Sequence, residues 1–85
     1  MENAAKLRVL YMEDDAGLAY LLRQALQKHN YNVAIVTNGE EGIQATSQDQ
    51  YDVLLIDHQM PYMTGIEVIR HLSQFDDTPP IIVLT

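Results

Sequence analysis

The stretch Val53-Leu54-Leu55-Ile56-Asp57 decides the fold, because it places a carboxylate directly after four consecutive apolar residues. Three other short runs, at 7–12, 33–36 and 81–84, are also nearly continuous in apolar residues. Strands that are buried on both faces of a parallel sheet have this pattern, whereas half-exposed strands alternate between apolar and polar residues. The four runs therefore predict four strands of a parallel sheet.

A first helix is predicted between the runs at 7–12 and 33–36. Apolar residues there recur at helical spacing, and Asp14 or Asp15 stands where an N-cap is expected. Lys28 and His29 fall in the last turn, where the helix dipole favours positive charge. The predicted apolar stripe comprises Leu18, Leu21, Leu22, Ala25 and Leu26.

Two more helices are predicted, one before and one after the run at 53–56. Asn38 and Glu41 open the second helix, and Thr64 and Glu67 open the third, each pair with the spacing of a capping box. Pro79-Pro80 ends the third helical segment before the last run. The predicted buried stripe of the third helix comprises Ile66, Val68, Ile69 and Leu72.

The order of elements is strand–helix–strand–helix–strand–helix–strand. Such units favour parallel strands joined by right-handed crossovers. The sequence therefore predicts an α/β fold with a doubly wound parallel sheet. If strand 2 lies outside strand 1, and strands 3 and 4 lie on the other side of strand 1, the strand order is 2-1-3-4. The first helix would lie on one face of the sheet and the other two helices on the opposite face. In this fold, ligands bind at the carboxyl ends of the strands where the strand order reverses, here between strands 1 and 3.

Carboxylates follow both strands at that reversal. Glu13, Asp14 and Asp15 come after strand 1, and Asp57 ends strand 3. Carboxylates that converge repel one another unless a cation joins them or some take up protons. Their oxygen atoms suit Mg²⁺, which bridges carboxylate and phosphate groups. The sequence therefore predicts an acidic, Mg²⁺-dependent site that handles phosphate, in which one carboxylate could act as the nucleophile and form an acyl phosphate.

Composition narrows the possible partners. The chain has 85 residues, so it is one small domain at most or a piece of one. Its 5 basic and 12 acidic residues give a net charge of −7, which argues against nucleic acid or an anionic membrane as a partner. The absence of cysteine excludes disulfides, thiol catalysis and zinc–thiolate sites, and suits a reducing cytoplasm. No apolar run is long enough to span a bilayer, and the first residues do not have the form of a secretory signal.

From about residue 7 to the last residue, the sequence resembles the receiver domain of two-component response regulators. The resemblance rests on four motifs and on the final run, which ends in Ile82-Val83-Leu84-Thr85. The motifs, in one-letter code, are VLYMEDD at 9–15, TNGEEG at 37–42, YDVLLIDHQMP at 51–61 and MTGIEV at 63–68.

The resemblance implies a role for each matching residue. Asp57 is similar to the aspartate that accepts a phosphoryl group from a histidine kinase or phosphotransfer protein. Glu13 and Asp14 match the acid pair that positions Mg²⁺, with Asp57 as a further ligand. Gln59 matches the position whose backbone carbonyl reaches the metal. Thr85 matches the hydroxyl residue that bonds a phosphoryl oxygen. The resemblance implies a phosphoacceptor that switches an output rather than an enzyme.

The chain departs from the family pattern at its end. It lacks the last helix, strand and helix of the complete domain, together with a lysine that would bind the phosphoryl group. We therefore expect residues 1–85 to form a single incomplete receiver domain. We also expect an uncovered sheet face and an open edge at the fourth strand, through which two copies could associate.

Other interpretations of the same residues remain open. Glu13, Asp14 and Asp15 could simply stabilise a helix N-terminus, and Thr85 could be an ordinary terminal residue. His58 adjoins Asp57, but a sequence neighbour of a nucleophile need not share its orientation. The domain could also be an interaction or dimerisation module that is never phosphorylated. A small hydrolase with an aspartyl nucleophile is less well supported, since a second aspartate two residues later is missing.

Overall fold

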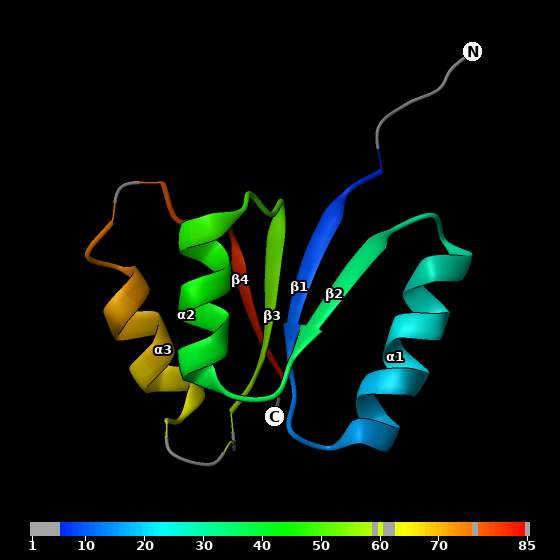
Figure 1. Cartoon of the computed structure of the whole chain (residues 1–85), viewed down its shortest axis with the longest axis horizontal. Helices are drawn as coiled ribbons and strands as arrows, with labels where there is room; N and C mark the ends of the chain where they lie inside the picture. Colours follow the sequence, from blue (N-terminus) through cyan, green and yellow to red (C-terminus); the bar gives the residue numbers. More distant parts are fainter. Residues whose placement is uncertain (1–5, 59, 61–62, 76, 85) are drawn as a thin grey trace.

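The computed structural model describes residues 6–58, 60, 63–75 and 77–84, which alternate between strands and helices along the chain (Figure 1). Among these residues, no helix is both long enough and apolar enough to cross a membrane. The elements in chain order are β1 (Arg8–Met12), α1 (Ala16–Lys28), β2 (Asn32–Val36), α2 (Gly39–Gln48), β3 (Val53–Asp57), α3 (Gly65–Leu72) and β4 (Ile81–Leu84).

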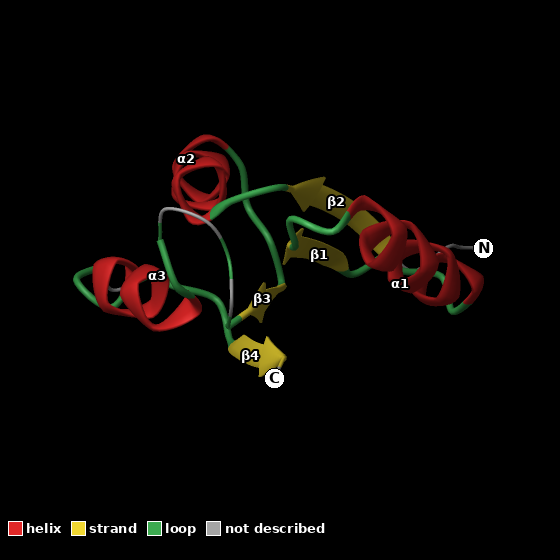
Figure 2. Ribbon diagram, turned by 90° about the horizontal axis from the view of Figure 1, so that it is seen from below, coloured by secondary structure: helices red, strands yellow, loops and turns green. Residues whose placement is uncertain are grey.

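All four strands form one parallel sheet in the order β2-β1-β3-β4. Seen from below, α1 lies on one side of the sheet, and α2 and α3 lie on the other (Figure 2). Both the strand order and the placement of the helices agree with the sequence. The predicted α/β class with a doubly wound parallel sheet is confirmed.

A separate apolar cluster fills each side of the sheet. On the side of α2 and α3, Leu10, Met12, Leu54, Ile56 and Val68 are fully buried. On the side of α1, the buried members are Val9, Tyr11, Ala19 and Val33. Successive residues of a strand point to opposite faces, so each nearly continuous apolar run serves both clusters. This explains why the strands lack a two-residue alternation.

The predicted caps of α1 and α3 are present. Asp15, rather than Asp14, caps α1, and its Oδ1 accepts a hydrogen bond of 3.1 Å from the backbone N–H of Leu18. Thr64 and Glu67 form a complete capping box at α3. In that box, the Glu67 carboxylate accepts from the Thr64 N–H at 2.8 Å.

The start of α2 differs from the predicted capping box. Asn38 does cap the helix, because its Oδ1 accepts from the Glu41 N–H at 2.9 Å. The Glu41 carboxylate, however, accepts from the backbone N–H and the hydroxyl of Thr37, at 2.9 and 2.8 Å. Only one half of the box therefore forms, because the Thr37 hydroxyl adds a second donor that the Asn38 backbone does not offer.

The predicted helix stripes are only partly buried. Leu22 and Leu26 pack against the α1-side cluster, but Leu18 and Leu21 are 54% and 64% exposed, and Ala25 is also exposed. In α3, the prediction that Ile66 is buried is wrong, since it is 48% exposed. Each predicted stripe therefore contains more residues than the helix buries.

Strand β4 lies at one edge of the sheet, where its residues are less covered than those of the central strands. Ile82 pairs with Leu55, which belongs to the α1-side cluster, so Ile82 faces the same side. Ile82 is 51% exposed and Val83 is 36% exposed. The predicted open edge is therefore present among the described residues, and self-association through it stays a prediction.

Candidate functional site

Three carboxylates meet at the carboxyl-terminal end of the sheet, which is called the acidic edge below. Figure 1 shows the ends of β1 and β3, the strands that these residues follow. One oxygen each from Glu13, Asp14 and Asp57 lies within 4.8 Å of the other two. Glu13 is buried, Asp57 is half-buried and Asp14 is exposed. The structure thus brings together acids that are more than forty residues apart in the sequence.

The register of the sheet explains this convergence. Met12 pairs with Ile56 at the end of the β1–β3 ladder, so the next residues, Glu13 and Asp57, face each other across neighbouring strands. The spacing between such strands is about 4.8 Å. A backbone hydrogen bond of 3.0 Å from the Glu13 N–H to the Val36 carbonyl continues the ladder to β2. Asp57 is paired in turn with β4, opposite Leu84.

Glu13 is the most buried acid of the three. It is 5% exposed, and both of its carboxylate oxygens accept hydrogen bonds. The Tyr11 hydroxyl donates to Oε1 at 3.0 Å, and the Asp15 N–H donates to Oε2 at 3.2 Å. Burial raises the pKa of Glu13, and the neighbouring Asp57 carboxyl raises it further, whereas the two donors oppose that shift. The charged form of Glu13 is therefore costly without a cation.

The donor set suits a hard divalent cation. Carboxylate oxygens are the ligands that Mg²⁺ prefers, and Mg²⁺ usually binds one or two carboxylates, with phosphate and water as the other ligands. Glu13, Asp14 and Asp57 supply three carboxylate oxygens within 4.8 Å of one another, so they can hold such an ion. The residues present therefore fit the metal that the sequence predicts.

The other predicted site residues have mixed outcomes. Gln59 and Thr85 lie outside the described residues, so their predicted roles stay predictions. Asp15 does not join the acid cluster, because its side chain caps α1. Sequence reasoning missed Tyr11, which it treated only as a strand residue. The available signal was its spacing of two from Glu13, which puts both side chains on one face of the strand.

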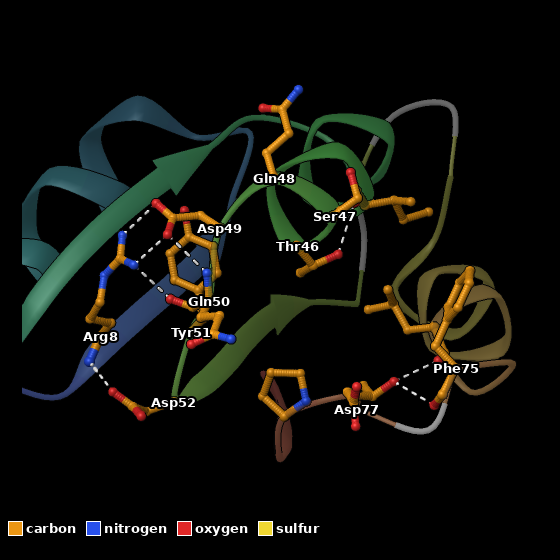
Figure 3. Close-up of a pocket in the computed structure, with 14 residues that line it drawn as sticks. Arg8, Thr46, Ser47, Gln48, Asp49, Gln50, Tyr51, Asp52, Phe75 and Asp77 are labelled. Atoms are coloured by element: carbon orange, nitrogen blue, oxygen red, sulfur yellow. Dashed lines mark hydrogen bonds and ion pairs between the residues drawn. The ribbon is translucent and has the colours of Figure 1, made fainter.

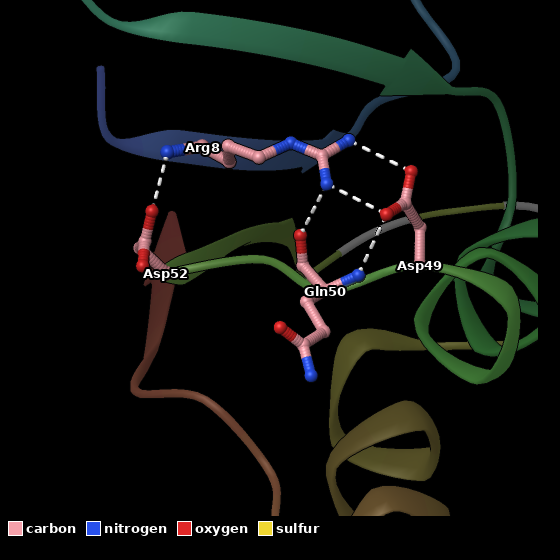
Figure 4. A network of polar contacts seen from close by, with 4 residues as sticks. All are labelled: Arg8, Asp49, Gln50 and Asp52. Atoms are coloured by element: carbon pink, nitrogen blue, oxygen red, sulfur yellow. Dashed lines mark hydrogen bonds and ion pairs between the residues drawn. The ribbon is translucent and has the colours of Figure 1, made fainter. Parts of the chain in front are cut away.

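A hollow lies at the opposite end of the sheet, where the strands begin. It is next to the start of β3 and the end of α2 (Figure 3). Arg8 lines one side of it, and its guanidinium donates to both oxygens of Asp49, at 2.6 and 2.8 Å, and to the Gln50 carbonyl at 2.8 Å (Figure 4). It also lies 4.9 Å from the centre of the Tyr51 ring. The Arg8 N–H donates to Asp52 at 2.6 Å. These contacts tie β1 to the α2–β3 connection, which is a structural role.

Comparison with known proteins identifies the family of the chain. The protein-family model of the response regulator receiver domain matches residues 9–85. The chain therefore belongs to the response regulator receiver domain family.

One curated relative is the transcriptional regulatory protein ResD of Bacillus subtilis. It is 36% identical over 85 residues, which cover all of this chain and 35% of ResD. The chain thus spans about a third of the length of the curated relatives that it matches.

Two solved structures with a similar fold contain magnesium. The receiver domain of the sensor histidine kinase PA1611 from Pseudomonas aeruginosa has a magnesium ion in its active-site cleft. It has a TM-score of 0.90 and 25% identity, and the match covers 95% of this chain and 68% of that one. The response regulator TrrA from Thermotoga maritima, solved with Mg²⁺ and BeF, has a TM-score of 0.88 and 30% identity, with coverage of 93% and 69%.

Proposed function

We propose that this receiver domain is a phosphoacceptor of two-component signalling and that Asp57 receives the phosphoryl group. The observation that carries the proposal is the meeting of Glu13, Asp14 and Asp57 within 4.8 Å at the carboxyl ends of β1 and β3. A histidine kinase or a phosphotransfer protein is the proposed donor. The magnesium-bound neighbours support the same edge as the place of reaction.

Asp57 is the proposed nucleophile because it ends a central strand and is only half-buried. A lone pair of its carboxylate oxygen would form the new O–P bond to a donor phosphohistidine. The N–P bond of the donor then breaks, and its electron pair stays on the imidazole nitrogen, which takes a proton from solvent. The product on this chain is an acyl phosphate.

Glu13 and Asp14 would hold Mg²⁺ beside Asp57. When bound, Mg²⁺ supplies positive charge that offsets the repulsion among the carboxylates and the phosphoryl oxygens. Glu13 is already oriented by two hydrogen bonds, whereas exposed Asp14 can adjust to the ion. The proposed site also includes the Gln59 carbonyl and the Thr85 hydroxyl. Their roles rest only on the resemblance to the receiver family.

In the whole protein, the proposed role of the acyl phosphate is to shift a conformational equilibrium and so control an output. The domain would act as a switch that accepts a phosphoryl group, not as an enzyme. Its proposed location is the cytoplasm, where the donor kinase domains and the phosphate chemistry would meet. The net charge of −7 supports a protein partner for this segment rather than nucleic acid or a membrane surface.

A titration with beryllofluoride, a mimic of the phosphoryl group, tests the proposal. In the presence of Mg²⁺, we expect beryllofluoride to shift backbone NMR signals around Asp57 and to raise the unfolding temperature of the chain. Without Mg²⁺, or in Asp57→Asn, neither change should occur. Glu40→Gln is the matched control, because Glu40 is an exposed acid in the first turn of α2. A wild-type chain that does not respond to Mg²⁺ and beryllofluoride would refute the proposal.

A second candidate is an interaction or dimerisation module that does not use phosphate. The exposure of Leu21 and Ile82, at 64% and 51%, favours it. Light scattering over a range of concentrations, combined with Asp57→Ala, separates the two candidates. Self-association or partner output that is unchanged by Asp57→Ala supports the second candidate. A monomer at high concentration, together with loss of output in Asp57→Ala, supports phosphoacceptance.

A further inference from the structure

We propose that Tyr11 is a positioning residue for the metal site, because its hydroxyl holds the Glu13 carboxylate in the orientation that binds the cation. This inference rests on the proposed phosphoacceptor function, since it concerns the same acidic edge. It assigns a role to a strand residue that lies outside the acid cluster itself.

Tyr11 reaches the site from inside the fold. Its ring is 3% exposed and packs in the α1-side cluster, and its hydroxyl lies 3.0 Å from Oε1 of Glu13. Glu13 directly follows β1 and is two residues after Tyr11, so both side chains lie on the side of the sheet that also carries Leu55 and Asp57. Burial, and then the hydrogen bond to Glu13, raise the pKa of Tyr11, so the hydroxyl remains a donor.

The two donors to Glu13 play complementary roles. The Asp15 N–H binds Oε2 at the start of α1, and the Tyr11 hydroxyl binds Oε1 from β1. A glutamate side chain has more rotatable bonds than an aspartate, and fixing them costs conformational entropy. Both carboxylate oxygens of Glu13 are already hydrogen-bonded, so much of this entropy is lost on folding and not on cation binding. Each oxygen keeps a further lone pair for a metal ion or its water.

A purely structural reading of the same bond is that a buried tyrosine hydroxyl needs some partner. The two readings differ in what the loss of the hydroxyl does. If the bond serves only the fold, Tyr11→Phe should alter stability and leave Mg²⁺ affinity unchanged. If Tyr11 positions Glu13, Mg²⁺ affinity should fall, because outer partners of metal ligands support both their orientation and their charge.

The test measures Mg²⁺ affinity by calorimetry in Tyr11→Phe, which keeps the buried ring and removes only the hydroxyl. We expect the dissociation constant to rise by at least about threefold, a modest value for a lost hydrogen bond to a charged group. Tyr20→Phe is the matched control, because the Tyr20 hydroxyl accepts a hydrogen bond from Gln24 on the exposed surface of α1. Its affinity should equal that of the wild type.

A second variant isolates the contact. In Glu13→Asp, the carboxylate is one methylene shorter, so it would no longer reach the Tyr11 hydroxyl. Adding Tyr11→Phe to Glu13→Asp should therefore change Mg²⁺ affinity very little. The carboxyl ¹³C resonance of Glu13 gives an independent readout without metal. It should shift in Tyr11→Phe and stay in place in Tyr20→Phe.

The possible failures are distinguishable. A wild-type chain that binds no Mg²⁺ would overturn the proposed function along with this inference. If the wild type binds Mg²⁺ and Tyr11→Phe binds it with a change below about threefold, only the inference fails. The inference also fails if Tyr11→Phe causes the same loss in the Glu13→Asp background, or if the Glu13 resonance does not move.

Discussion

Replacing Gly65 with alanine should disturb both the fold and the acidic edge, because Gly65 lies against the backbone that carries Asp57. Gly65 is buried at the first position of α3, and its N–H donates to the His58 carbonyl at 3.1 Å. An added Cβ would lie 3.1 Å from the Asp57 carbonyl oxygen and 3.1 Å from the His58 Cα. The φ of Gly65 is not positive, so the requirement is for space.

The expected loss follows from what surrounds that Cβ. Two of its three nearest atoms belong to the backbone, and the third is the Ile56 Cγ2 at 3.2 Å. Inserting a methyl group into such packing costs about 1–3 kcal/mol. Alanine returns at most about 1 kcal/mol of helix propensity, and less at the first helical position. We therefore expect Gly65→Ala to lower the free energy of unfolding by about 1–2 kcal/mol.

Urea unfolding followed by far-UV circular dichroism, with and without Mg²⁺, measures this loss. Gly17→Ala is the matched control, because its Cβ would meet only the Asp15 Oδ1, at 3.3 Å, on the exposed start of α1. We expect the control to leave stability nearly unchanged. Because Asp57 must shift, Gly65→Ala should also weaken Mg²⁺ binding. Wild-type stability and affinity in Gly65→Ala would show that the contact with the Asp57 backbone is not tight.

Three further predictions follow from the same structure. Leu54 is fully buried, so Leu54→Ala should cost about 2–5 kcal/mol in urea unfolding, and a loss below about 1 kcal/mol would contradict the assigned core. The Arg8 ion pair lowers the pKa of Asp49 from 3.8 to about 2. The ion pair therefore stabilises the fold at pH values above 3.8. This stabilisation is lost as the pH falls through about 2. The free energies of unfolding of wild type and Asp49→Asn, measured as the pH is lowered, should therefore become equal near pH 2. A difference that persists at lower pH would contradict a stabilising ion pair. Burial raises the pKa of Glu13 above 4.5, and protons compete with the metal. Calorimetry should show Mg²⁺ affinity falling as pH is lowered towards that raised pKa, and an affinity independent of pH would exclude Glu13 as a ligand.

The architecture could be predicted from the sequence because its signals are local. Four apolar runs, the intervening helical spacings and the caps at Asp15 and Thr64 each depend on residues within one element. The order of elements, together with the right-handed crossover, then limits the topology. Once strands 1 and 3 are taken as neighbours, the same reasoning places Glu13 and Asp57 together, because both residues follow the carboxyl ends of those strands.

The extent of burial could not be predicted in this way. Leu21 and Ile66 belong to apolar stripes, yet both are largely exposed, because a stripe does not reveal how wide a surface its helix will cover. At α2, only the three-dimensional position of the Thr37 hydroxyl explains why the Glu41 carboxylate turns away from the Asn38 backbone.

The sequence by itself determined the strands, the helices and the acids that follow the strands, because these signals depend on neighbouring residues. Only the tertiary structure decided how those acids are held. The bond from Tyr11 to Glu13 depends on the depth at which the ring packs, and the close approach of Gly65 to the Asp57 backbone depends on where α3 begins against β3. Both are distances between packed atoms, and these are settled by the whole core.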